Sequence, residues 1–209
     1  MTKTIYLIRH GQTDGNATPQ FMPRTAPLNE LGHQQAKLVA ERCKALGADA
    51  LVSSTMTRAV ETAEYIAAAT GLKVESSDHF IELLKAESMI ELLKASEEGI
   101  ALHATYIAAY KYGEKYEDAE TYSDVQDRIT AGLTLLEEHP ADNIIVVSHG
   151  EFLRSLLIRT LFGDNIGGEA ELQAKGAMEH LTNTAISTFT FNDGVWRLKM
   201  WNDHAHFAD

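Results

Sequence analysis

Two short apolar runs, far apart in the sequence, each end in a histidine followed by a glycine. Residues 5–8 lead into Arg9-His10-Gly11, and residues 144–147 lead into Ser148-His149-Gly150. Continuous apolar runs of this length are typical of strands that are buried on both faces, as in a parallel sheet. Because ligands of open α/β sheets bind outside the carboxyl ends of the strands, we expect the two histidines to share one site.

Helix and strand patterns alternate along the rest of the chain. Amphipathic helices are predicted at about 30–46, 57–70, 122–138 and 151–162, and short strands at about 50–52 and 72–75. Asn29 is a suitable N-cap for the first helix, and Gly47 and Gly71 are suitable stops for the first two. Asp193-Gly194 between the β-rich runs 184–191 and 195–201 predicts an antiparallel hairpin.

This alternation predicts an α/β fold, a three-layer α/β/α sandwich whose mostly parallel sheet carries a C-terminal β-hairpin. We expect one domain over residues 1–209. The stretch at about 81–122 is rich in Ala, Leu, Glu and Lys, and we expect it to form a helical insertion or lid. Residues 11–28 hold three of the four prolines, and we expect this loop to wall a pocket.

Charge and composition bear on several classes of function. The net charge of -12 argues against a nucleic-acid partner, because phosphate backbones are bound mainly through Lys and Arg. No apolar run reaches the roughly 20 residues that span a bilayer, and the chain begins with a strand, so we expect a cytoplasmic protein without a membrane partner. The glycine patterns of nucleotide binding are absent, so a nucleotide cofactor has no support in the sequence. The oligomeric state is left open.

The residues around the two strand ends suit the transfer of a phosphoryl group. A neutral imidazole at His10 is a competent nucleophile toward phosphorus, and the Arg9 guanidinium can pair two phosphate oxygens. Arg58, at the start of a helix, can add a second guanidinium, and His149 can donate to oxygens that gain charge in the transition state. The leaving alcohol must also be protonated, and Glu82 is the candidate acid.

Several sequence motifs, which follow one another along the chain, support this interpretation. They lie at 7–13 (Leu-Ile-Arg-His-Gly-Gln-Thr), 53–63 and 147–150, with supporting signatures at 27–32, 123–128, Asn183 and 201–206. Together they resemble the histidine phosphatase superfamily, which has the phosphoglycerate mutase-like fold, and within it the phosphatase branch. The resemblance covers nearly the whole chain and is weakest over residues 81–119.

By this resemblance, His10 is the residue that becomes phosphorylated, while Arg9, Arg58 and His149 clamp the transferring group. The resemblance also implies hydrolysis without a metal or organic cofactor. In such enzymes the histidine attacks the ester, a phosphohistidine forms, and water then releases phosphate.

The resemblance assigns further positions more loosely. Glu82 falls where the phosphatase branch places its proton donor, and Asn16 matches a phosphate-contacting asparagine. Gly150 follows the second histidine in a turn that brings backbone N–H groups toward an anion. The chain departs from the family pattern after Glu82, where residues 83–87 replace a Trp-Glu-Gly-like turn, and in the loop 20–24, which lacks the common Gln-Gly pair.

We therefore expect a phosphomonoesterase that acts on a small phosphorylated metabolite. Two alternatives stay open, a mutase that returns the phosphoryl group to a bound acceptor and a non-catalytic module that binds a phospholigand. The sequence does not choose among sugar phosphates, phosphoglycolate-like acids, ribazole phosphate and protein phosphohistidine as substrates.

Overall fold

A six-stranded sheet forms the centre of the molecule in the computed structural model, which describes residues 2–207 except the side chain of Asn165. Its strands, in chain order, are β1 (Lys3–Arg9), β2 (Ala50–Ser53), β3 (Val74–Ser76), β4 (Asn143–Ser148), β5 (Ile186–Asn192) and β6 (Val195–Asp203). The spatial order is β3-β2-β4-β1-β5-β6. The first four strands pair in parallel, and β5 and β6 continue the sheet in the antiparallel sense.

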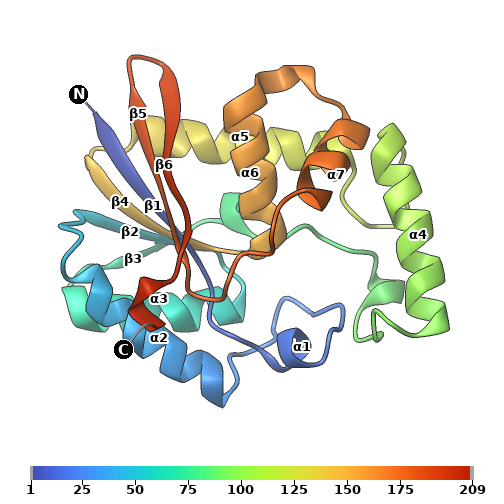
Figure 1. Ribbon diagram of the computed structural model, residues 1–209, viewed down its shortest axis with the longest axis horizontal. Coiled ribbons are helices and arrows are strands. Elements are labelled where there is room, and N and C mark those ends of the chain that lie inside the picture. The colour runs from blue at the N-terminus through green and yellow to red at the C-terminus, as the bar shows by residue number, and fades with distance from the viewer. Residues whose placement is uncertain (1, 208–209) are drawn as a thin grey trace.

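Helices cover both faces of this sheet (Figure 1). They are α1 (Asp14–Ala17), α2 (Glu30–Cys43), α3 (Thr57–Thr70), α4 (Glu97–Tyr112), α5 (Tyr122–Glu138), α6 (Gly150–Phe162) and α7 (Gly168–Gly176). One apolar cluster joins α2 and α3 to one face of the sheet, and a second joins α5 and α6 to the other. The predicted three-layer α/β/α sandwich is therefore confirmed, with α4 and α7 packed beyond the sheet on the side of α6.

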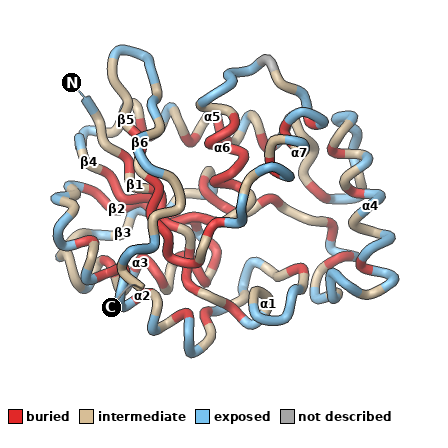
Figure 2. The backbone as a smooth tube through the Cα atoms, in the orientation of Figure 1, coloured by how far each residue is buried: buried red, intermediate tan, exposed pale blue. Residues whose placement is uncertain are grey.

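The buried core follows from the alternation of side chains along the central strands. In β4, Ile144 and Val146 point into the cluster with α5 and α6, whereas Ile145 and Val147 point into the cluster with α2 and α3. All four side chains are fully buried. Figure 2 shows this burial concentrated in the central strands and in α6. A strand buried on both faces must be apolar throughout, as the sequence of β4 is.

Local signals place the ends of several elements as predicted. The Asn29 side chain accepts a hydrogen bond of 2.9 Å from Gly32 N at the start of α2, although α2 ends at Cys43, a few residues before the predicted stop. Gly71 ends α3 in the left-handed conformation. Asp193 and Gly194 have φ of 51° and 75°, the positive values that a tight two-residue hairpin turn requires. The predicted hairpin of β5 and β6 is confirmed.

The prediction of a helical segment over about 81–122 is wrong for its first third. The only α-helix that lies wholly within it among the described residues is α4, which the Ser96 side chain caps. Before α4 the backbone pairs with the loop after α1, since Phe21 N donates to Leu92 O and Lys94 N donates to Pro19 O. Helix propensity is a weak preference that such tertiary contacts override.

Helix α7 was not anticipated from the sequence. It has little amphipathic character to reveal it, and it begins at Gly167-Gly168 without a side-chain cap. Gly168, the first residue of α7, packs closely against α4. A Cβ at this position would lie 2.4 Å from Tyr110 O. None of the described helices combines the length and apolarity that a bilayer span requires.

Candidate active site

The carboxyl ends of three parallel strands bring the predicted residues together. β1 and β4 are in register at Arg9 and Ser148, so the two histidines that follow them become neighbours. The imidazole rings of His10 and His149 have centroids 5.0 Å apart. Ser54, the residue after β2, completes the group because its Oγ lies 2.8 Å from His149 Nε2.

The hydrogen bonds of His10 define which ring nitrogen is free to react. Its Nδ1 lies 2.6 Å from the carbonyl oxygen of Gly11, which can only accept, so Nδ1 carries the proton. Nε2 then carries a lone pair, and it accepts a hydrogen bond of 3.2 Å from Arg58 Nε. Burial, and then the charges of Arg58 and Arg9, hold the pKa of His10 well below 6.5. The imidazole is therefore neutral near pH 7.

His149 is fully buried, and its hydrogen bonds fix the same tautomer as in His10, with the proton on Nδ1. Ser54 Oγ accepts from Met56 N at 3.2 Å, which leaves its hydroxyl proton for His149 Nε2. Nδ1 of His149 then bears the ring proton, and it has no partner among the described residues. Burial, followed by the charges of Arg58, His10 and Arg9, lowers the pKa of His149 well below its ordinary value. A buried donor without a partner is uncommon and suits a ligand oxygen.

Two guanidinium groups flank His10. Arg9 donates from one terminal nitrogen to Leu181 O, and its Nε is buried and without a partner among the described residues. Arg58 donates to His10 Nε2 and, at 3.1 Å, to Pro23 O. Burial lowers the pKa of both, that of Arg58 to about 10, so both stay charged near pH 7. The uncompensated positive charge and the free donors make this an anion site.

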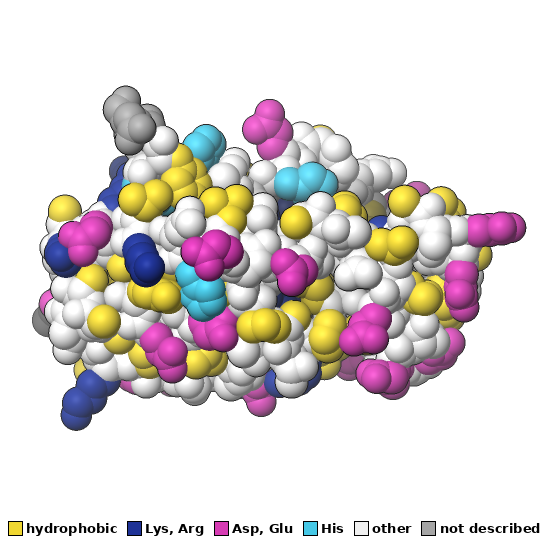
Figure 3. Space-filling view, turned by 90° about the horizontal axis from the view of Figure 1, so that it is seen from below, with side chains coloured by type: hydrophobic (Ala, Val, Ile, Leu, Met, Phe, Trp, Pro, Cys, Tyr) yellow, Lys and Arg dark blue, Asp and Glu magenta, His cyan; other side chains and the backbone are white. Residues whose placement is uncertain are grey.

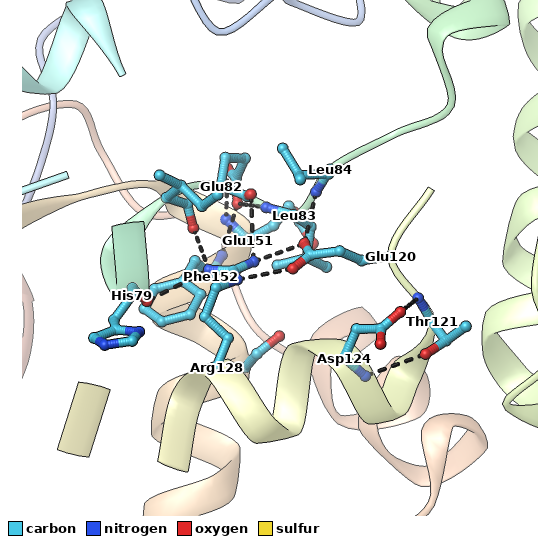
Figure 4. Close-up of polar contacts among 12 residues, drawn as sticks. His79, Glu82, Leu83, Leu84, Glu120, Thr121, Asp124, Arg128, Glu151 and Phe152 are labelled. Carbon is cyan, nitrogen blue, oxygen red and sulfur yellow. Dashed lines mark hydrogen bonds and ion pairs between the residues drawn. The ribbon is translucent and has the colours of Figure 1, made fainter. Parts of the chain in front are cut away.

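Glu82 lies at the N-terminal end of α6 (Figure 4) and lines the same cavity as His10. Its Oε1 accepts from Phe152 N at 2.8 Å and from Leu83 N at 3.0 Å, and its Oε2 accepts from Glu151 N at 3.2 Å. Two of these N–H groups belong to the first turn of α6, where the helix dipole favours an anion. The carboxylate uses three of about four acceptor positions, which leaves one for a ligand.

An ion pair fixes the backbone on which Glu82 is carried. Arg128 donates two hydrogen bonds of 2.7 and 2.8 Å to the Glu120 carboxylate and a third of 2.7 Å to Ile81 O (Figure 4). Glu120 in turn accepts from Leu84 N at 2.8 Å. Both side chains are largely buried, 10% and 12% exposed. Arg128 and Glu120 therefore act as a clamp on the backbone of residues 81–84.

Asn16 is linked to His10 through Asn183, and Gly150 lies beside Arg9. Asn16 Oδ1 accepts from Thr13 N at 3.2 Å and from Asn183 Nδ2 at 3.3 Å, and no acceptor for its own amide nitrogen is recorded among the described residues. Asn183 also donates to His10 O at 2.9 Å. Gly150 begins α6, and a Cβ there would lie 3.4 Å from Arg9 Nε. The glycine keeps the space above the Arg9 guanidinium open.

A cavity of about 660 Å³ opens beside these residues. Five of the predicted site residues line it: Arg9, His10, Asn16, Glu82 and Gly150. Arg58 and His149 do not line it, and each is instead a direct neighbour of His10. Within residues 2–207, no group of three or more His, Cys, Asp or Glu side chains is placed to hold a metal ion.

Three residues that support the site belong to the sequence motifs described above, but the sequence did not indicate what they do. Ser54, Arg128 and Asn183 all lie in motifs noted above, so position in a motif was the available signal. Their contacts with His149, with the segment that carries Glu82 and with His10 O depend on tertiary structure alone. A fourth, Glu120, lies outside those motifs.

Comparison with known proteins gives a family match over nearly the whole chain. The profile of the histidine phosphatase superfamily (branch 1) matches residues 5–204. The "Uncharacterized phosphatase PhoE" of Bacillus subtilis is 29% identical over 98% of this chain and 96% of its own length. The "Probable phosphoglycerate mutase GpmB" of Salmonella arizonae is 30% identical over 94% of this chain and 89% of its own length.

Solved structures agree on the fold. A mycobacterial glucosyl-3-phosphoglycerate phosphatase complexed with VO3 superimposes with a TM-score of 0.79 and 23% identity, covering 96% of this chain and 99% of its own. A phosphoserine phosphatase mutant from Entamoeba histolytica superimposes with a TM-score of 0.79 and 22% identity, covering 98% and 99%. At these identities the likeness concerns the fold alone.

Proposed function

Because the chain belongs to the histidine phosphatase superfamily, whose members are phosphatases or mutases, we propose that it hydrolyses a small phosphomonoester through a phosphohistidine at His10. One observation carries the proposal. The reactive Nε2 of His10 lies among donors that lack protein partners, Arg9 Nε and His149 Nδ1, at the edge of a cavity. A dianionic phosphoryl group would satisfy both donors.

In the first step, His10 Nε2 uses its lone pair to form a bond to phosphorus as the bond from phosphorus to the ester oxygen breaks. Arg58 Nε, which now donates to Nε2, transfers its hydrogen bond to a phosphoryl oxygen. Arg9 and His149 donate to the oxygens that gain charge, and Glu82 gives a proton to the leaving alcohol. The products of this step are the free alcohol and a phosphohistidine.

In the second step, the Glu82 carboxylate takes a proton from water, and the water oxygen attacks phosphorus. The bond between phosphorus and Nε2 breaks, its electron pair returns to His10, and inorganic phosphate leaves. Asn16, near the first turn of α1, is proposed to hold one phosphate oxygen through its free amide, and Gly150 leaves room above Arg9 for another.

The test is release of phosphate from a panel of small phosphomonoesters in the presence of EDTA. We expect release by the natural chain and none by His10→Ala. His33→Ala removes a partly buried imidazole outside the cavity and serves as the control, which should keep its activity. Release that persists at an equal rate in His10→Ala would contradict the proposal.

A mutase is the second candidate, favoured by the relative named as a phosphoglycerate mutase. Its chemistry differs only in the acceptor, because an alcohol in the cavity would take the phosphoryl group in place of water. The same assay separates the two when a second alcohol is added, since a mutase forms a new phosphoester and a phosphatase releases phosphate. Binding of phosphoesters without either product would indicate a phospholigand-binding module. A cytoplasmic location remains a prediction from the sequence.

A further inference from the structure

A second group of basic side chains lines the same cavity where it meets α4. Each member of the group contacts the next, and we name the group the α4 row: Lys94, Phe21, His103, Tyr106 and Lys85. Lys94 Nζ lies 5.4 Å from the ring centroid of Phe21, and Lys85 Nζ lies 4.0 Å from that of Tyr106. The His103 ring bridges the two aromatic rings, with centroids 5.4 and 6.4 Å away.

The aromatic rings contact the two ammonium groups but leave their N–H donors free to bind a ligand. A cation over a ring face is attracted by the ring quadrupole and keeps its N–H donors available. Among residues 2–207, neither Lys85 nor Lys94 takes part in an ion pair or a side-chain hydrogen bond. Neither ammonium group is therefore in direct contact with a carboxylate of these residues.

The two carboxylates that line the cavity are already engaged elsewhere. Glu82 accepts the backbone N–H groups at the start of α6. Glu151 pairs with Arg154 at 3.1 Å and with Lys175 at 4.0 Å. The wall formed by the α4 row is thus positive within a chain of net charge -12, whose surface in Figure 3 shows scattered acidic side chains and few basic ones.

The environment of Lys85 disfavours its charge mainly through burial. Burial lowers the pKa of Lys85 to about 8, the attraction of Glu151 and of Glu82 opposes this shift, and the repulsion of Lys175 and of Lys94 adds to it. An anion bound at this amine would relieve the repulsion. Burying an ammonium without a partner is unfavourable, so its position on the cavity wall suits a ligand.

We propose that Lys85 and Lys94 form a subsite for a second anionic group of the ester whose phosphoryl group His10 attacks. The inference rests on the proposed function. The substrate class is then a small phosphomonoester with a carboxylate or a second phosphate at its far end. The sequence after Glu82, which departs from the family pattern, supplies Lys85.

Matched esters test the subsite directly. The series is propyl phosphate and two three-carbon analogues, one whose terminal carbon is a carboxylate and one whose terminal carbon carries a second phosphate, together with the same five-carbon set. The readout is the ratio of kcat/KM between each anionic ester and its alkyl counterpart. We expect a ratio of about ten to a hundred for the better anionic ester, the range of one charge-assisted hydrogen bond.

Substitutions of the two lysines test whether they cause this ratio of kcat/KM. Lys85→Met and Lys94→Met should each bring the ratio toward one, Lys85→Arg should keep most of it, and the exposed Lys73→Met, which lies outside the cavity, should leave it unchanged. Comparing the carboxylate with the phosphate series identifies the preferred anion.

Two results would overturn the inference: a ratio near one in the natural chain, or an unchanged ratio in Lys85→Met. Both leave the proposed function standing, because the esters are still hydrolysed. If no ester is hydrolysed, the proposed function fails, and the same ratio is taken from binding constants measured by calorimetry. A binding ratio of ten or more that Lys85→Met abolishes would then still support the subsite, and equal binding would refute it.

Discussion

Replacing Glu82 by glutamine tests whether this carboxyl group protonates the leaving alcohol. The amide oxygen can keep the hydrogen bonds that Oε1 accepts from Phe152 N and Leu83 N. The amide nitrogen would face Glu151 N, which now donates to Oε2 at 3.2 Å, so one buried donor loses its acceptor. We expect Glu82→Gln to lower the free energy of unfolding by about 1–3 kcal/mol, the penalty for such a group.

The effect on catalysis depends on the leaving group. An alkyl phosphate needs a proton on the departing oxygen, whereas nitrophenyl phosphate releases a stable phenolate. Loss of a general acid typically lowers the rate by about 100- to 10,000-fold. We expect a loss in kcat/KM of that size for propyl phosphate and of about tenfold or less for nitrophenyl phosphate, measured as phosphate or nitrophenol release at low substrate concentration. The ratio kcat/KM reports formation of the phosphohistidine and leaves out its hydrolysis, which is common to both esters.

Equal losses for the two esters would refute this role, because a variant that was merely misfolded or bound phosphate poorly would affect both alike. Glu151→Gln is the matched variant, since Glu151 is the other carboxylate on the cavity wall. If Glu151→Gln shows the leaving-group dependence instead, Glu151 is the acid. The exposed Glu87 lies nearby outside the cavity, and Glu87→Gln should change neither rate.

Two further predictions concern the buried charges and imidazoles. Arg128→Met leaves the largely buried Glu120 without its partner and should lower the free energy of unfolding by about 3–5 kcal/mol in chemical denaturation. It should also reduce the rate ratio of alkyl to aryl ester, which a loss of stability alone would not do. Because burial depresses the pKa of His10 and His149, the unfolded chain binds protons that the native chain does not. The free energy of unfolding should therefore fall as pH drops below about 6.5, by about 1.4 kcal/mol per pH unit for each imidazole. Urea denaturation between pH 7.5 and 5.5 measures this slope, and a profile without it would contradict the assignment of neutral histidines.

The strand ends were predictable because two independent signals agree there. Apolar runs buried on both faces indicate parallel strands, and parallel strands place the residues that follow them at one edge. His10, His149 and Ser54 meet for this reason. The helix caps and the Asp193-Gly194 turn could also be predicted from the sequence, because each depends on one or two residues and their neighbours.

The segment before α4 could not be read in this way. Its composition favours a helix, but its conformation is decided by the Arg128 and Glu120 clamp and by pairing with the loop around Phe21, both distant in sequence. The burial of Arg58 and His149 behind His10 is likewise a tertiary property. The α4 row escaped prediction because its members come from three separate segments.

The central claim is that His10 carries the phosphoryl group during turnover, and rapid quenching with a phosphorus-labelled ester tests it most directly. Mixing the protein with the ester for milliseconds and quenching in base should trap an acid-labile label on the peptide that contains His10. The label should be missing from His10→Ala and should turn over at the rate of phosphate release. A label on another residue, or full phosphate release with no label on His10 at any time, would contradict the mechanism.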